Sequence, residues 1–221
     1  MEVIMSKKLV GIMVTALLLL SLSNISFSQD SPMKFGVRGG LNLANTNEGT
    51  PEGVDKKMRT TFGVGGVLEY CVSPMFAIQV NALYNMKGVK FKGTESVMGQ
   101  SYEFEGAGKY TYLSIPIFAK VPFGQGTTRP YIILGPEIGI LLSAKAWAKV
   151  SGVSADTDVK EHMKSLEFAL NFGAGIGFPI GSMSAFVEGR YGLGLTNTWK
   201  ESEDSIKNSV IYINLGILLG Q

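Results

Sequence analysis

The sequence has little of the chemistry that enzymes and nucleic-acid-binding proteins use. Among its 221 residues there is one cysteine, Cys71, and one histidine, His162, and charged residues make up 17% of the chain. One cysteine excludes an intrachain disulfide and leaves the thiol without a second cysteine for a metal site or redox pair, so we expect Cys71 to be a small buried strand residue. A formal net charge of +2 gives no electrostatic basis for binding nucleic acid.

Candidate catalytic and ligand-binding residues are equally scarce. His162 lies near Asp156, Asp158 and Glu161, so a metal site or an acid–base pair is one interpretation, and a solvated loop is the one that we favour. The glycine-rich stretches "GVGGV" and "GAGIGF" lack the spacing of a dinucleotide-binding loop. We therefore predict no catalytic, cofactor-binding or metal site, and no enzymatic activity.

The N-terminal segment indicates export. Two lysines precede residues 9–20, which carry no charge, and small serines follow. This order is typical of a cleaved secretory signal peptide, whereas a membrane-spanning helix needs about 20 apolar residues. We predict a signal peptide over residues 1–28 and one further domain over residues 29–221, in which no other long apolar run occurs.

After residue 30 the chain alternates between apolar and other residues with a period of two, which predicts β-strands. The chain has 28 glycines, well above the usual share of about 7%. The connections are alternately long and short, so all long ones lie at one end, as in outer-membrane barrels with an even strand number. The predicted strands are residues 33–44, 60–72, 76–91, 110–124, 131–143, 165–178, 183–196 and 209–219, and the long connections are residues 45–59, 92–108, 144–164 and 197–208.

The two sides of these strands differ in composition. One side carries isoleucine, leucine, valine, phenylalanine, methionine and tyrosine, and the other carries glycines with one or two charges per strand. A soluble surface would be denser in charge, so the second side suits a crowded interior, and eight strands are just wide enough for side chains to fill it. Buried charges must be paired, and the predicted lumenal set is balanced. It comprises Arg38, Glu69, Lys87, Lys120, Glu137, Glu167, Glu188 and Arg190.

The fold class predicted from this pattern is an all-β, eight-stranded, antiparallel, up-and-down transmembrane barrel with a polar, largely filled lumen. Its location is the cell outer membrane, and its first partner is membrane lipid. Five aromatic residues fall near predicted strand ends, where a lipid-interface girdle would place them, although packing of the loops is an alternative. They are Tyr70, Tyr84, Tyr110, Tyr191 and Trp199.

Four stretches resemble the porin-family, PorT-like outer-membrane β-barrels common in Bacteroidota. They are "FGVRGGLNLA", "YLSIPIFAK", "PYIILGPEIGILL" and "VEGRYGLGLTN". The resemblance covers roughly residues 35–219 and implies insertion by the barrel-assembly machinery of a Gram-negative cell. The resemblance implies fold and location more than activity. For the PorT-like members it implies an accessory role in protein secretion.

Three functions fit the sequence. The first is a structural, adhesion or assembly component, with a protein partner at the long outer loops or the periplasmic turns. The second is a narrow pore for water, ions or very small solutes. The third is a soluble periplasmic ligand-binding barrel of lipocalin type, which requires an apolar cavity and a polar exterior.

Overall fold

The computed structural model describes residues 32–50, 53–97, 100–124, 126–150, 152–200 and 205–220. From Pro32 onwards these residues form one unit. The predicted signal peptide over residues 1–28 lies outside the described residues, so its existence stays a prediction.

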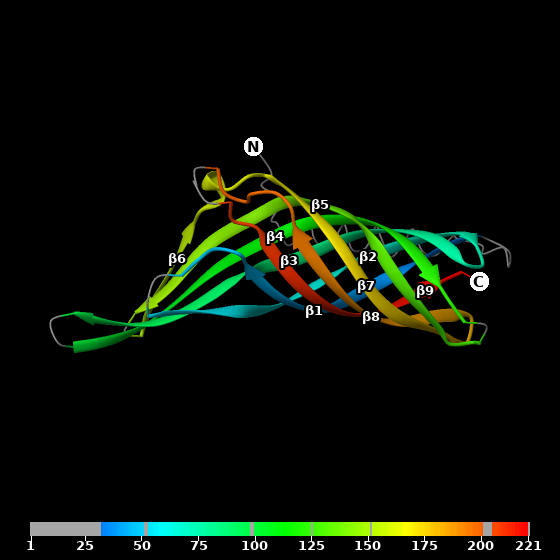
Figure 1. The fold of residues 1–221 in the computed structure, drawn as a ribbon, viewed down its shortest axis with the longest axis horizontal. Helices are drawn as coiled ribbons and strands as arrows, with labels where there is room; N and C mark the ends of the chain where they lie inside the picture. Colours follow the sequence, from blue (N-terminus) through cyan, green and yellow to red (C-terminus); the bar gives the residue numbers. More distant parts are fainter. Residues whose placement is uncertain are drawn as a thin grey trace, which may run out of the picture. The chain divides into compact units, whose positions relative to one another are not determined.

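Strands make up most of the described chain, and eight of them close into a ring (Figure 1). Neighbouring strands pair in the order β1-β2-β3-β4-β5-β7-β8-β9, and β9 pairs with β1; every pairing is antiparallel. The eight-stranded up-and-down barrel is confirmed. The strands are β1 (Met33–Thr46), β2 (Val54–Ser73), β3 (Phe76–Val97), β4 (Gln100–Pro122), β5 (Arg129–Val150), β6 (Val153–Asp158), β7 (Leu166–Ile180), β8 (Met183–Gly194) and β9 (Asn208–Leu219).

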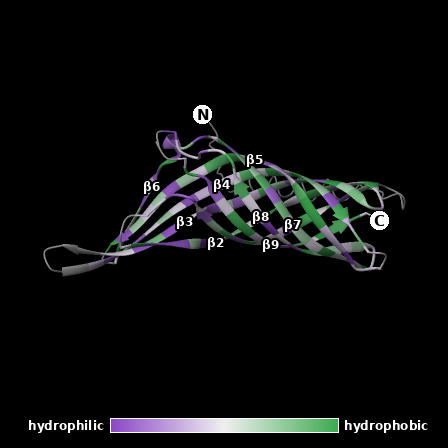
Figure 2. Cartoon of the chain, viewed as in Figure 1, coloured by the Kyte–Doolittle hydropathy of each residue, from purple (hydrophilic) through white to green (hydrophobic). Residues whose placement is uncertain are grey.

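The two faces of the barrel follow the period of two in the sequence. Large apolar side chains such as Val37, Leu134 and Leu215 are exposed on the outer surface, while polar side chains such as Asn42 and Glu137 are buried inside. An apolar exterior around a polar interior is the arrangement of a barrel surrounded by lipid. In Figure 2 hydrophilic residues gather at the end where β6 lies, and hydrophobic residues cover the strand segments away from it.

The proline inside the fourth strand is accommodated by a local break in pairing. The register of β4 with β3 runs to Ile117, opposite Val80, and resumes at Ser114, opposite Leu83. Pro116 lies in this gap and pairs only with Glu137 on β5. Because proline has no N–H to donate, a missing partner on one side is the condition under which a barrel strand tolerates it.

Two of the predicted long connections are largely strand, so those predictions were wrong. Residues 92–108 belong mainly to a continuation of β3 and β4, and residues 144–164 contain the end of β5 together with β6. Beyond the lipid both faces of a strand meet water, so the alternation of apolar and polar residues that identifies a lipid-facing strand is no longer required. The predicted strand ends fell where that alternation stops.

The long connections and β6 mark one end of the barrel, which we call the loop end; the short turns lie at the other, the turn end. At the loop end a short 3-10 helix, η1 (Lys160–His162), follows β6. Within the described part of the chain, no helix has the length and apolar character needed to cross a membrane.

Candidate functional site: the lumen and the loop-end sheet

All eight charged residues predicted for the lumen are buried inside the ring. They come from seven of its eight strands, because every second residue of each strand points inward. The same interior holds buried asparagines and tyrosines, together with an apolar cluster of Val67, Phe118, Ile133, Phe186 and Leu218. Arg38 is on β1, Glu69 on β2, Lys87 on β3, Lys120 on β4, Glu137 on β5, Glu167 on β7, and Glu188 and Arg190 on β8.

Two ion pairs lie towards the turn end. Lys120 Nζ is 2.6 Å from Glu69 Oε2 and 4.2 Å from the centroid of the Tyr131 ring. The Tyr131 hydroxyl donates to Glu188 Oε2 at 3.2 Å, and the Arg38 guanidinium pairs with the other oxygen of the same carboxylate. Tyr131 thus connects two ion pairs into one network that spans the lumen.

A second cluster is built around Lys87, further towards the loop end. Lys87 Nζ lies 3.0 Å from Glu137 Oε1 and 3.1 Å from Glu167 Oε2. The remaining carboxylate oxygens accept hydrogen bonds from two asparagines at 3.1 Å, Asn171 for Glu137 and Asn208 for Glu167. One cation therefore neutralises two acids, and each acid has its other oxygen satisfied.

Arg190 lies between these two networks and differs from the other lumenal cations. Its guanidinium carbon is 4.2 Å from the Tyr212 ring centroid and 5.1 Å from that of Phe118. Its side chain is buried, and none of its three nitrogens has a hydrogen-bond acceptor among the described residues. Contact with aromatic faces stabilises the charge, but buried donors of this kind are normally satisfied, with ordered water as the usual partner where protein supplies none.

Three amide groups of the lumen also lack a hydrogen-bond partner for their nitrogen among the described residues. The side-chain nitrogens of Asn81, Asn85 and Asn214 are buried without an acceptor in the described part of the chain. Polar cavities of this kind hold structural water. We therefore expect ordered water beside these nitrogens.

The loop end of the lumen is closed by apolar side chains. Met163, which follows η1, is 1% exposed and packs in a cluster with Tyr110, Tyr112 and Leu141. A β-bridge joins Met163 to Trp199, so two long connections meet over the barrel mouth. Sequence reasoning missed Met163, because a single methionine in a polar segment gives no periodic signal.

This closure also corrects the predicted aromatic girdle at two positions. Tyr110 is buried inside the barrel and Trp199 packs against the same cluster, so for these two the alternative of loop packing holds. Tyr70 and Tyr84 are exposed on the outer surface.

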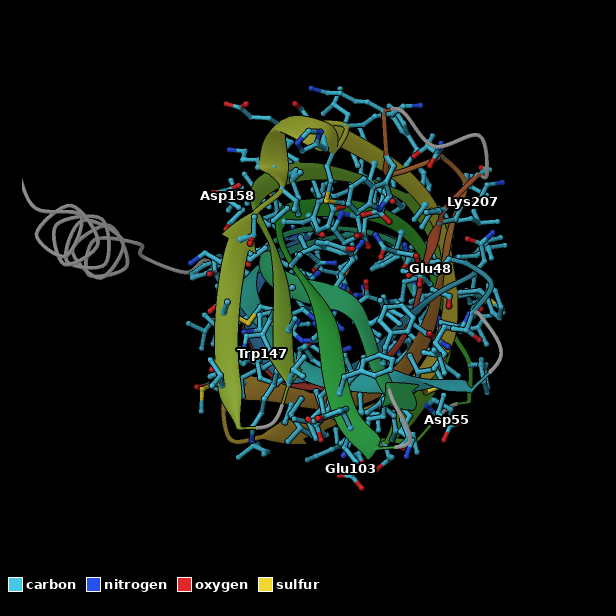
Figure 3. The ribbon with its side chains drawn as sticks, turned by 90° about the vertical axis from the view of Figure 1, so that its left-hand side faces the viewer. Glu48, Asp55, Glu103, Trp147, Asp158 and Lys207 are labelled. Atoms are coloured by element: carbon cyan, nitrogen blue, oxygen red, sulfur yellow. The ribbon has the colours of Figure 1, made fainter. Side chains whose placement is uncertain are left out.

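Beyond the barrel mouth, five strands continue as an open sheet, which we call the loop-end sheet. Its outward face continues the lipid-facing surface and is charged; Figure 3 looks onto this end, with Asp55, Glu103, Trp147 and Asp158 labelled. Lys109 Nζ is 3.1 Å from Asp156 Oδ1 and 5.1 Å from the Trp147 ring centroid. The sheet consists of residues 54–58 of β2, 89–97 of β3, 100–109 of β4, 144–150 of β5 and 153–158 of β6.

The outward face of this sheet holds one carboxylate between two lysines, which makes a pH-dependent contact. Glu105 lies 2.5 Å from Lys92 Nζ and 3.3 Å from Lys90 Nζ. The hydrogen bond from Lys92, and then that from Lys90, lowers the pKa of Glu105 below its usual value, and the same contact raises the pKa of Lys92. A lowered acid pKa means that the contact is present above the ordinary glutamate range and lost as the pH falls through the lowered value.

We expect the carboxyl carbon of Glu105 to titrate below the usual glutamate midpoint in an NMR pH titration. In the Lys92→Met variant the pKa of Glu105 should rise towards the ordinary glutamate range, because the strongest hydrogen bond to the charged form is gone. The Lys145→Met variant, which removes an exposed lysine that does not contact Glu105, serves as the control and should leave the Glu105 midpoint lowered. An unchanged Glu105 midpoint in the Lys92→Met variant would contradict the contact.

The remaining candidates from the sequence do not form a site. His162 is exposed in η1, and Cys71 is half-buried in β2, with its Sγ 3.9 Å from Glu69 Oε1. Among the described residues no group of three or more histidine, cysteine, aspartate or glutamate side chains is placed to hold a metal ion.

A closed eight-stranded ring with an apolar exterior and a charged, filled interior defines a transmembrane β-barrel of the outer-membrane class. The family model described as "outer membrane protein beta-barrel domain" matches residues 27–200. The chain belongs to this family and is an outer-membrane protein.

Solved structures with a similar fold are distant in sequence. Neisserial surface protein A is 12% identical with a TM-score of 0.48, covering 86% of this chain and 98% of its own. The attachment invasion locus protein Ail of Yersinia pestis, solved with the heparin analogue sucrose octasulfate, is 16% identical with a TM-score of 0.41, covering 85% and 99%. OprG of Pseudomonas aeruginosa is 10% identical with a TM-score of 0.40, covering 89% and 100%. No curated protein matches the chain.

Proposed function

We propose that this protein is a non-conducting outer-membrane barrel that acts through its loop end, as an adhesion or assembly component that binds a protein partner there. The observation that carries the proposal is the contrast between the two parts of the molecule. The lumen is closed by paired charges and by the cluster around Met163, whereas the loop-end sheet projects beyond the apolar surface with ordered ion pairs. In barrels of this class the longer connections face the cell exterior.

The more specific part of the proposal, which concerns the kind of partner, rests on the resemblance in sequence. The four stretches that resemble PorT-like barrels of Bacteroidota support an accessory role in secretion, in which the partner would be another component of an export apparatus. Export through the predicted signal peptide and insertion by the barrel-assembly machinery belong to the same proposal. An absence of enzymatic activity remains a prediction.

We expect the purified protein to give no discrete current steps in a planar lipid bilayer. The lumen is filled by ion-paired, aromatic and apolar side chains, and an eight-stranded barrel leaves little bore. The control is the Glu167→Gln variant, because any current that passes through the lumen must change when a lumenal charge is removed. Discrete steps whose ion selectivity differs between the wild type and the variant would contradict a non-conducting barrel.

A narrow pore for water or very small solutes is the second candidate. The unpaired donors of Arg190 and of the three lumenal asparagines favour it, because such donors normally bind ordered water. Osmotic swelling of proteoliposomes tests water passage separately from ionic current. The lipocalin-type alternative fails, because it requires an apolar cavity, and the observed interior is charged while the exterior is apolar.

A further inference from the structure

The loop-end sheet has an open edge at β6. Among the described residues β6 pairs only with β5, and all six of its residues are exposed. The register of this pair runs from Val150 opposite Val153 to Lys145 opposite Asp158 without a shift. An unpaired strand edge presents a row of N–H and C=O groups that another strand can bind.

The hydrogen-bond pattern shows which backbone groups face outward from this edge. The Val159 N–H donates to the Ala144 carbonyl at 3.1 Å. In an antiparallel pair, hydrogen-bonded residues alternate with non-bonded ones, so Thr157, Ala155 and Val153 bond to β5. The backbone N–H and C=O groups of Ser154, Asp156 and Asp158 therefore point towards the open edge.

The open edge has no proline, no lysine and no bulge, and its only charged residues are Asp156 and Asp158. Natural edges are protected by proline, by lysine or by bulges, and β6 has the sequence VSADTD with a regular register. The opposite edge of the sheet, residues 54–58 of β2, is different. There the Lys56 side chain donates to the carbonyls of Thr46 at 2.9 Å and of Glu48 at 2.5 Å, so a lysine crosses the β2 edge.

From β3 to β6 the outward face of the loop-end sheet mostly alternates in charge from strand to strand, while β2 carries both Asp55 and Lys57 on this face. The β3 strand contributes Lys90 and Lys92, β4 contributes Glu103 and Glu105 together with Lys109, β5 contributes Lys145 and Lys149, and β6 contributes Asp156 and Asp158. Opposite charges on neighbouring strands attract, and like charges repel. A strand added beside β6 would continue this order if it presented basic residues on the outward face, next to Asp156 and Asp158.

The inward face of the same hairpin is apolar except for Thr157, although it is exposed. Val150 is 50% exposed and Val153 is 77% exposed, and Ala146, Ala148 and Ala155 share this face. A strand added to the edge would extend this surface and gain from placing its own apolar residues there.

We propose that the open edge of β6 binds an extended segment of a partner protein as an additional strand, with basic residues on its outward face and apolar residues on its inward face. This inference rests on the proposed function, in which the loop end is the binding surface. The main-chain bonds supply affinity, and the alternating side chains supply specificity, as in other cases of strand addition. A second copy of β6 fits poorly, because it would place aspartates beside Asp156 and Asp158.

The test uses the full barrel in zwitterionic detergent micelles and a nine-residue peptide of alternating lysine and valine. We expect the peptide to slow amide hydrogen exchange at least tenfold at Ser154, Asp156 and Asp158, and to leave Ala155 and Thr157 unchanged because their amides already bond to β5. A peptide of alternating glutamate and valine should give no protection, since its acids would lie beside those of β6.

A matched pair of variants separates edge binding from damage to the fold. Ser154→Pro removes one edge-facing N–H and should abolish the protection at Asp156, while Ser154→Val keeps that N–H and should preserve it. Both should retain the heat-dependent gel mobility of a folded barrel.

Four outcomes would overturn the proposal. They are equal protection by the two peptides, protection that survives Ser154→Pro, protection at Asp55 of β2 instead of at β6, and the absence of any protection. A current through the lumen would count against the non-conducting function without affecting this test, and a silent bilayer with no peptide protection would reject only the edge site.

Discussion

Replacing Lys87 with methionine should destabilise the barrel by about 3–5 kcal/mol, the cost of leaving buried charge without its partner. Lys87 is 2% exposed and is the cation that neutralises both Glu137 and Glu167. Methionine fills a similar volume and cannot compensate either carboxylate. The measurement is the free energy of unfolding by urea in lipid vesicles, followed by the fluorescence of the chain's two tryptophans, Trp147 and Trp199.

Two further variants decide whether charge is the cause. Lys145→Met removes an exposed lysine that has no ion pair among the described residues, and it should change stability by no more than about 0.5 kcal/mol. The triple variant Lys87→Met, Glu137→Gln, Glu167→Gln removes both uncompensated charges and should recover most of the loss. If Lys87→Met behaves like Lys145→Met, the lumen is wet enough to hydrate the two carboxylates, and the lumenal charges do not form the structural network that we propose.

The strand number and the orientation of each strand could be predicted from the sequence, for a simple physical reason. Lipid outside and a crowded polar interior impose a period of two on every membrane-spanning strand, so Leu215 and Asn214 are assigned to opposite faces by composition alone. The same rule places Lys87 and Glu137 in the lumen. It says nothing of how far neighbouring strands are displaced along each other, so it could not predict that these two residues, on β3 and β5, meet across the lumen.

The features at the loop end could not be predicted, because there the lipid no longer constrains the pattern. The β5–β6 hairpin carries lysines and a tryptophan on one face and alanines on the other, an alternation in size and charge that a search for apolar faces overlooks. In retrospect the two valines that flank the turn, Val150 and Val153, are the signal of a hairpin. Met163 closes the mouth through tertiary packing, to which no local pattern corresponds.

The second large effect should follow from placing a charge in lipid. Leu215 lies near the middle of β9, opposite Gly39 of β1 and Val187 of β8, and is 61% exposed on the outer surface. An arginine on the lipid face near the bilayer midplane costs about 2–4 kcal/mol, so Leu215→Arg should lower the free energy of unfolding in vesicles by that amount. Its fraction of heat-modifiable, folded protein should fall in parallel.

The matched control is Val153→Arg, which places the same side chain at an exposed valine of β6 on the loop-end sheet. Because that position meets water, the stability should change by no more than about 0.5 kcal/mol. The exposed fraction alone does not distinguish the two sites, since the side chains of Leu215 and Val153 are both exposed on the surface. We expect lipid around Leu215 and water around Val153. A large loss of stability from arginine at Leu215, with none at Val153, therefore places the lipid boundary between them. Equal effects at the two positions would mean that β9 does not face lipid, and the assignment of the apolar exterior to the membrane would be wrong.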